Sequence, residues 1–96
     1  MRKITKQAVN AFMNAENFKG SNTIVKVEKG ISYLFLHGNM IAKRSADGRL
    51  EITNAGWQTN TTKERLNGLP NVSINQKNSR WYLNGEEWDG ELTTIN

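Results

Sequence analysis

The chain divides at residues 56–67, GWQTNTTKERLN, because strand-like sequence lies on both sides of a helix signal. Thr61 precedes Glu64 by three residues, the capping-box spacing in which a hydroxyl and a carboxylate bond backbone N–H groups at the start of a helix. Gly68 and Pro70 follow closely, and such a pair typically ends a helix. The stretch therefore predicts a short helix of about two turns within residues 59–69.

A longer helix is predicted within residues 1–20. Thr5 can act as its N-cap, and we expect the helix to run to about Phe18. Ala8, Phe12 and Ala15 recur at spacings of four and three residues, which gathers apolar side chains on one helix face. That face must pack against another element of the fold.

Residues 23–54 alternate with a period of two and predict an antiparallel β-meander. Three turn signals divide the segment: Lys29-Gly30, Gly38-Asn39 and Asp47-Gly48. If each is a two-residue loop, the cross-strand pairs are Val25–Leu34, Leu36–Ile41 and Lys43–Ile52. One face of the meander then collects the apolar residues Val25, Val27, Leu34, Leu36, Ile41, Leu50 and Ile52. We expect the first helix to pack on this core face.

The opposite face of the predicted meander mixes aromatic and basic groups: Ile24, Lys26, Tyr33, Phe35, Ala42, Arg44, Glu51 and Thr53. Rings interleaved with cations suit a single-stranded nucleic acid, and the positive charge also suits an acidic protein surface. The predicted partner-binding residues are Lys26, Tyr33, Phe35, Lys43, Arg44 and Arg49. The alternative is that C-terminal segments or a second subunit cover the two rings.

Residues 71–90 predict further β-hairpins, followed by a tail at residues 91–96. Asn84-Gly85 is the strongest two-residue turn signal in the chain. It places Trp81 opposite Trp88, and we expect both indoles, together with Trp57, to be structural. An exposed tryptophan would instead mark a binding hot spot.

These elements predict an α+β fold in a single domain, residues 1–96: an N-terminal helix on a β-meander, then a short helix and a C-terminal hairpin. The chain has no cysteine, so it needs no disulfide and suits a reducing cytoplasm. It also has no apolar run of signal-peptide or membrane-span length. We therefore expect neither export nor a membrane partner.

Positive charge is concentrated in the first half of the chain. Residues 1–49 carry nine basic and three acidic groups, a net charge of +6, whereas residues 50–96 carry four and six, a net charge of −2. The basic half can attract a phosphate backbone or an acidic protein surface by the same long-range field. The alternative is that scattered lysines only keep the domain in solution.

Catalytic chemistry finds little support in the sequence. The only histidine, His37, lies beside a turn without a fixed partner and reads as a strand-end residue. Glu86, Glu87, Asp89 and Glu91 form the one acidic cluster, and carboxylates beside a turn are usually solvated. We therefore predict no enzyme activity, no cofactor and no metal site.

Several short motifs together resemble a family of short proteins encoded by tailed bacteriophages. The motifs run through most of the chain: Asn22-Thr23-x-Val25, Leu34-x-Leu36-His37-Gly38-Asn39-x-Ile41-Ala42, Gly56-Trp57-x-Thr59-x-Thr61-Thr62-x-x-Arg65-Leu66-Asn67, Gln76-Lys77, Trp81-Tyr82-Leu83-Asn84-Gly85 and Trp88-Asp89-Gly90. The resemblance implies a viral protein made in the cytoplasm of an infected bacterium. It supplies no catalytic residues to transfer.

By analogy with phage accessory proteins of this size, the resemblance favours a non-enzymatic binding protein. Its expected role is a stoichiometric inhibitor of a host defence complex, of the anti-CRISPR type. The alternative is a small nucleic-acid-binding module that uses the same basic and aromatic face. A pure DNA mimic would be strongly acidic, which this chain is not. The oligomeric state stays open.

Overall fold

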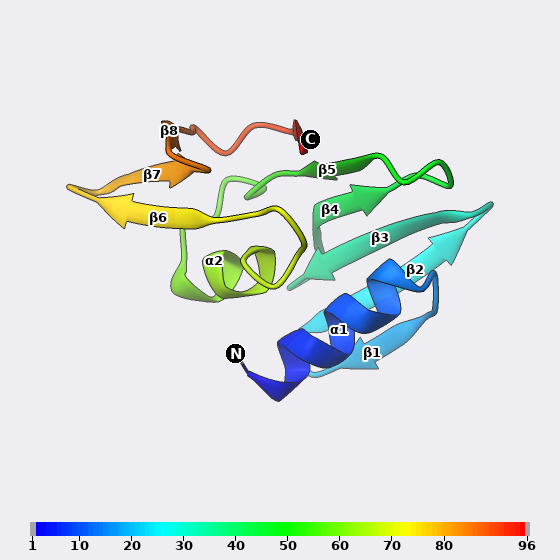
Figure 1. Ribbon diagram of the computed structural model, residues 1–96. Helices are drawn as coiled ribbons and strands as arrows, with labels where there is room; N and C mark the ends of the chain where they lie inside the picture. Colours follow the sequence, from blue (N-terminus) through cyan, green and yellow to red (C-terminus); the bar gives the residue numbers. More distant parts are fainter. Residues whose placement is uncertain (1, 96) are drawn as a thin grey trace.

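The computed structural model describes residues 2–95, which form two helices and nine strands in two antiparallel sheets (Figure 1). The larger sheet has six strands in the order β1-β2-β3-β4-β5-β9, and the smaller has three in the order β6-β7-β8. In chain order the elements are α1 (Lys3–Met13), β1 (Phe18–Gly20), β2 (Thr23–Glu28), β3 (Ile31–Leu36), β4 (Asn39–Arg44), β5 (Leu50–Ile52), α2 (Asn60–Leu66), β6 (Ile74–Lys77), β7 (Arg80–Leu83), β8 (Glu86–Glu87) and β9 (Thr93–Ile95). The predicted α+β class is confirmed.

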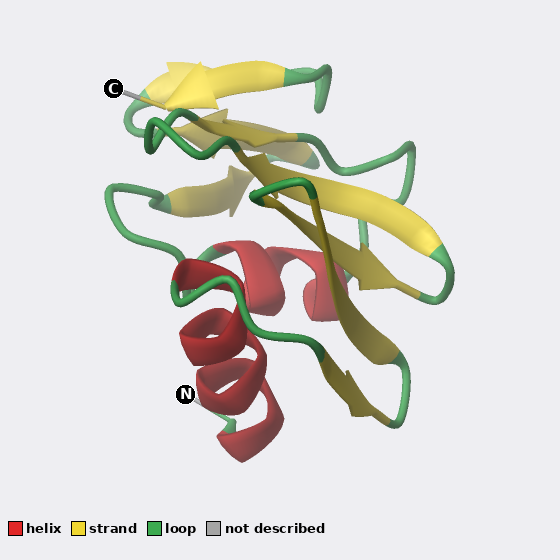
Figure 2. Ribbon diagram, turned by 90° about the vertical axis from the view of Figure 1, so that its right-hand side faces the viewer, coloured by secondary structure: helices red, strands yellow, loops and turns green. Residues whose placement is uncertain are grey.

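Both helices lie on one side of the large sheet, as Figure 2 shows. α1 packs on β1, β2 and β3, and α2 packs on β4 and on α1. The core between these layers contains Ala8 and Phe12 of α1 and the apolar residues of the sheet. Of the core face predicted from the sequence, Val25, Leu34, Leu36, Ile41, Leu50 and Ile52 are buried, and Val27 is partly buried against them. The small sheet extends the same core through Ile74, Trp81 and Leu83.

The first hairpin of the meander has the predicted register and the second does not. Lys29 and Gly30 both have positive φ, 52° and 79°, as a type I′ turn requires, and Val25 faces Leu34. The second turn is His37-Gly38, with φ of 50° and 81°. Leu36 therefore faces Asn39. The predicted Gly38-Asn39 turn and the Leu36–Ile41 pair are wrong.

Two irregularities then reset the register of β4 and β5. The β3–β4 pairing shifts at Leu34 and Phe35, so that Phe35 faces Met40 whereas Leu34 faces Ala42. The next connection closes with Ser45 N–H donating to Arg49 O at 2.9 Å, which leaves three residues in the loop instead of the expected two. Gly48 takes a φ of 93° there, as in a three-residue loop with a G1 bulge.

The consequence is that Ile52 faces Ala42 and Lys43 faces Glu51, so the predicted Lys43–Ile52 pair is wrong. Leu50 and Ile52 nevertheless stay on the core side, because the two one-residue differences cancel. Ala42 is fully buried. Arg44, which faces Leu50, lies on the core side of the sheet as well.

α1 begins and ends earlier than the sequence predicted. Arg2 is the N-cap, and its backbone N–H donates to Glu64 Oε2 of α2 at 3.3 Å. Thr5 is therefore inside the helix, and its predicted capping role is wrong. The helix ends at Met13, Ala15 takes a positive φ of 53°, and Phe18 begins β1. Neither helix of the described residues is long and apolar enough to cross a membrane.

α2 has the predicted length of about two turns, but its cap lies two residues earlier than expected. Thr59 is the N-cap, and its Oγ1 accepts from the Thr62 N–H at 3.1 Å. The Thr61–Glu64 capping box is wrong because Glu64 bonds to α1 instead. After the helix, a Cβ on Gly68 would lie only 2.7 Å from the Thr5 methyl group. This glycine therefore allows the two helices to approach closely.

The C-terminal segment adds the last edge strand to the large sheet. Asn84-Gly85 forms the predicted turn, with Leu83 facing Glu86, and the Trp88 N–H donates to Trp81 O at 2.9 Å. The predicted tail is wrong for residues 93–95, which form β9 beside β5, and residue 96 lies outside the described residues. The Gly90 carbonyl accepts a hydrogen bond from the Asn54 N–H at 3.1 Å. This bond ties the segment before β9 to the end of β5.

Candidate functional site

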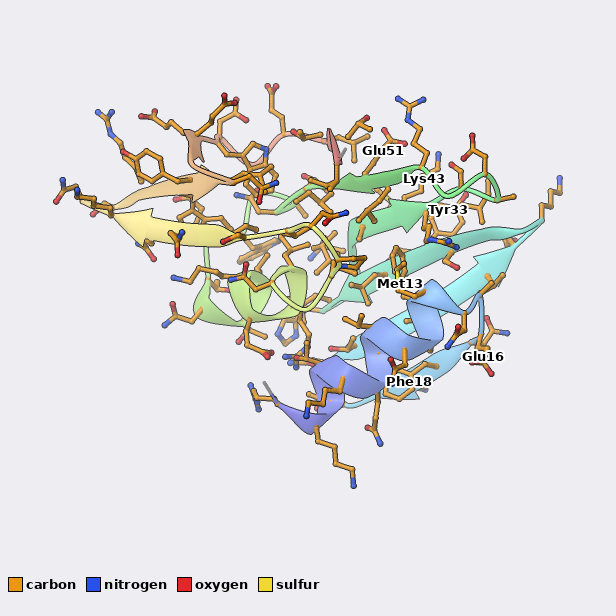
Figure 3. All side chains as sticks on the ribbon, viewed as in Figure 1. Met13, Glu16, Phe18, Tyr33, Lys43 and Glu51 are labelled. Carbon is orange, nitrogen blue, oxygen red and sulfur yellow. The ribbon has the colours of Figure 1, made fainter. Side chains whose placement is uncertain are left out.

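The side of the large sheet opposite the helices presents a row of polar side chains, one from each of five strands. The row follows the cross-strand pairs from β2 to β9 in the order Lys26, Tyr33, Lys43, Glu51 and Thr94. Figure 3 shows Tyr33, Lys43 and Glu51 on neighbouring strands, with Met13 on the helix side. A tyrosine is thus flanked by two lysines, and the row ends in a carboxylate and a hydroxyl.

A second, more apolar row lies beside the first. Ile24 faces Phe35, and Phe35 faces Met40. The ring centroids of Tyr33 and Phe35 are 6.4 Å apart, and Lys26 Nζ lies 5.9 Å from the centre of the Phe35 ring, within the range of a cation–π contact. All three apolar side chains are half-buried. We call the two rows together the open face.

The structure brings together most of the partner-binding residues predicted from the sequence. Lys26, Tyr33, Phe35 and Lys43 share the open face. Arg49 lies in the loop before β5 but reaches the end of the first row, where its Nη2 donates to Thr94 at 3.3 Å. Its Nε also lies 4.0 Å from Glu51 Oε1.

Two residues predicted on this face are not there. Arg44 and Ala42 pair in register with residues of the core side, because the bulge in β4 shifts the alternation by one residue. Lys43 takes the place expected for them.

The C-terminal residues do not cover the rings. β9 pairs with β5 at the edge of the sheet, and Tyr33 and Phe35 are partly buried. Residues 93–95 therefore lie at the edge of the sheet and not over these rings, and cover by a second subunit stays a prediction. The open face combines aromatic rings with lysines, which is a surface chemistry that can contact a protein or a nucleic acid.

The most connected ionisable groups of the described chain lie in the interface between the helices and the sheet. Arg65 of α2 is 1% exposed. Its Nε donates to Thr23 at 3.0 Å, its Nη1 donates to Thr5 at 2.8 Å, and Nη1 also contacts Glu64. Three elements, α1, β2 and α2, are therefore joined at one buried guanidinium.

The same interface changes the ionisation of Glu64. Burial raises the pKa of this carboxyl, but hydrogen bonds from Thr5 and the Arg2 N–H and the charge of Arg65 together lower the pKa below its ordinary value. These contacts favour the ionised form of Glu64. The carboxylate in turn bonds the N-terminus of α1 and the Arg65 side chain. We interpret this pair as structural.

Of the three tryptophans, Trp57 differs from its predicted role. Trp81 and Trp88 are buried as expected, with ring centroids 6.4 Å apart. Trp57 is 58% exposed, so its predicted structural role is wrong. Ala55 and Gly56 directly before it both take positive φ, so Trp57 follows a turn.

Beside Trp57 the surface is hollowed by a pocket of about 250 Å³, lined by Leu36, His37, Asn39, Ile41, Asn54, Trp57, Thr59, Thr61 and Thr62. The pocket lies between the β3–β4 turn and the first turn of α2. Its floor is apolar, since Leu36 and Ile41 are buried core residues. The pocket and the open face are separate features of the molecule.

Two carboxylates of the C-terminal acidic cluster, Glu87 and Asp89, have local partners. Glu87 Oε1 lies 3.1 Å from Arg80 Nη1, and Asp89 accepts from the Glu91 N–H at 2.9 Å. Among residues 2–95, no three His, Cys, Asp or Glu side chains gather as a metal site would need. His37 lies on an exposed turn.

The comparisons with known proteins give one result. A family model described as Kyanoviridae Gp96 protein matches residues 1–95. This match spans both helices and all the strands described above. No curated protein and no solved structure matches the chain.

Proposed function

The chain belongs to the Kyanoviridae Gp96 family of phage proteins, and we propose that it is a non-enzymatic binding protein that blocks a host defence complex. The proposed role is that of a stoichiometric inhibitor, of the anti-CRISPR type, acting in the cytoplasm of the infected bacterium. The open face is the proposed contact surface. The single observation that supports this most is a sheet with both helices on one side and partly buried rings beside lysines on the other.

Two features of the open face favour a protein partner. The Lys26 ammonium lies over the Phe35 ring, so this ring is less free to stack on a base. Ile24 and Met40 extend the apolar area on either side of Phe35, and aromatic residues and methionine are enriched at protein interfaces. An acidic protein patch would meet Lys26 and Lys43, with apolar contacts beside them.

The non-enzymatic part of the proposal rests on where the ionisable groups lie. Glu64 and Arg65, the strongest pair, are bonded to each other and to the Thr5 hydroxyl within the packed interface. A catalytic acid or base needs access to a substrate proton. The hydrogen bonds of this pair are instead made to other side chains of the protein, Thr5 and Thr23.

A second candidate, nucleic-acid binding, is favoured by one observation. Lys26 and Lys43 lie on either side of Tyr33. A single-stranded nucleic acid could stack a base on this ring while its phosphates meet the two lysines. Binding of this kind would weaken steeply with salt, because each neutralised phosphate releases counterions.

The test is protection of a phage in a bacterial host with an active CRISPR system directed against that phage. We expect the wild-type protein to raise the efficiency of plating, and the double variant Lys26→Glu, Lys43→Glu to reduce that gain at least about tenfold, since a charge reversal in an interface removes roughly 1.4 kcal/mol or more of binding. Lys3→Glu, Lys6→Glu is the matched control, because it makes the same charge change at exposed positions of α1. The control should protect like the wild type.

Three outcomes would count against the proposal. If the wild-type protein gives no protection against any defence system of the host, the inhibitor role is wrong. If both double variants lose protection equally, the open face is not the contact surface. If a labelled single-stranded oligonucleotide binds at low salt and only the Lys26, Lys43 variant loses binding, the nucleic-acid role replaces the protein role.

A further inference from the structure

The pocket beside Trp57 is a second candidate contact site, separate from the open face and independent of its proposed role. It measures about 250 Å³ and lies on the helix side of the large sheet. Ligand pockets for larger molecules usually span about 300–1,000 Å³. This pocket is therefore of a size for a single ring.

The walls of the pocket are held in place. The Trp57 N–H donates to Asn54 O at 2.8 Å, and the Gly56 N–H donates to Asn54 Oδ1 at 2.8 Å. Ala55 takes a φ of 55° within this turn, and His37 on the opposite wall takes a φ of 50°. These contacts fix the backbone of the turn that carries Trp57 at the rim of the pocket, so less backbone freedom is lost when a partner binds.

The chemistry of the lining selects an uncharged, mostly apolar occupant. The floor is formed by Leu36 and Ile41, and no Lys, Arg, Asp or Glu of the described chain lines the pocket. The Thr59 hydroxyl is already hydrogen-bonded to two groups of Thr62, the backbone N–H and the side-chain hydroxyl. A nucleotide would bring a phosphate, for which the lining offers no lysine or arginine.

We propose that this pocket receives one uncharged aromatic side chain from a partner protein. The ring would lie on the aliphatic floor and pack against the Trp57 indole, in the offset or edge-to-face geometry that aromatic pairs prefer. Such an inserted ring is the usual form of an interface hot spot.

The test uses indole as the probe, added to the full-length protein and followed by two-dimensional NMR. We expect saturable shifts of the Trp57 Nε1–H signal and of the His37 and Thr61 backbone amides, with a Kd on the order of 1 mM for so small a molecule. Trp57→Ala should weaken binding at least about tenfold, the change expected when an aromatic partner in a pocket is removed. Leu92→Ala is the matched control, because Leu92 is the other large hydrophobic residue exposed among residues 2–95, at 52%.

Because Trp57 is exposed, its replacement leaves the core packing intact, and an unchanged melting temperature verifies this. The inference is overturned if indole gives no saturable shifts, if the shifts centre elsewhere, or if Trp57→Ala binds as the wild type does. It is also overturned if adenosine monophosphate binds the same residues as tightly as indole, since the pocket would then accept nucleotides. These results are independent of phage protection, so the two proposals can fail separately.

Discussion

Replacing Arg65 with methionine tests whether the buried polar network joins the two helices to the large sheet. The guanidinium is 1% exposed and bonds to the hydroxyls of Thr23 and Thr5 and to Glu64. Methionine keeps much of the apolar stem and removes every donor. The change therefore isolates the charge and its hydrogen bonds from the packing.

The expected loss is large. Removing one member of a buried ion pair costs about 3–5 kcal/mol, against a total unfolding free energy of about 5–15 kcal/mol for a typical domain. The Glu64 side chain keeps 27% of its exposure, so water can partly solvate it, which favours the lower limit of about 3 kcal/mol. At about 4–8 °C per kcal/mol for a domain of this size, the melting temperature should fall by at least about 12 °C.

The matched control is Arg80→Met. Arg80 also pairs with a glutamate, Glu87, at 3.1 Å, but the two side chains are 67% and 58% exposed. Exposed pairs contribute about 0–1 kcal/mol, so this variant should unfold at nearly the wild-type urea concentration. Urea unfolding followed by far-ultraviolet circular dichroism gives both midpoints. Equal shifts in the two variants would refute the assignment of a structural role to Arg65.

Three further predictions concern the ionisation of Glu64 and the close contacts at Gly68 and Gly90. The fold lowers the pKa of Glu64, so its contribution to stability is fully present above the unfolded pKa of about 4.3 and is lost as the pH falls through the folded value. The difference in urea midpoint between Glu64→Gln and the wild type should therefore shrink across that window, and a constant difference would contradict this. Gly68→Ala should cost about 1–3 kcal/mol in urea unfolding, because its Cβ would lie 2.7 Å from the Thr5 methyl group; unchanged stability would mean that α1 is not so close. Gly90→Ala should cost roughly 2–6 kcal/mol in the same measurement, because the glycine has a φ of 91° and its Cβ would lie 2.1 Å from the Asn54 amide. A loss below about 1 kcal/mol would place Gly90 outside this contact.

The sequence could predict the fold class and the core because hairpin signals and alternation act locally. Lys29-Gly30 and Asn84-Gly85 each place their turn correctly. His37-Gly38-Asn39 offers two overlapping two-residue turns, and local chemistry does not choose between them. The bulge in β4 and the three-residue loop after it each shift the register by one residue, and no residue in the sequence marks the bulge. Their effects cancel at β5, which is why Ile52 was placed correctly and Arg44 was not.

The roles of Glu64 and Trp57 depend on contacts across the fold. Glu64 has capping-box spacing from Thr61, but its carboxylate accepts hydrogen bonds from Arg2 and Thr5 of the α1 N-terminus instead. Trp57 is 58% exposed at the end of the Ala55-Gly56 turn, although its size favours burial. β9 was missed because its pairing with β5 joins residues more than 40 positions apart. Such pairings cannot be read from local patterns.

The most direct test of the open face is its exposure to solvent in the assembled protein. NMR signals of the methyl groups of Met40 and Ile41 can be compared after adding a soluble gadolinium chelate. The two residues are adjacent, but Ile41 is 1% exposed in the core, whereas Met40 faces Phe35 on the open face. We predict strong broadening of the Met40 signal and little change at Ile41. If Met40 is as protected as Ile41, the face is not open to solvent, and the proposed contact surface is wrong.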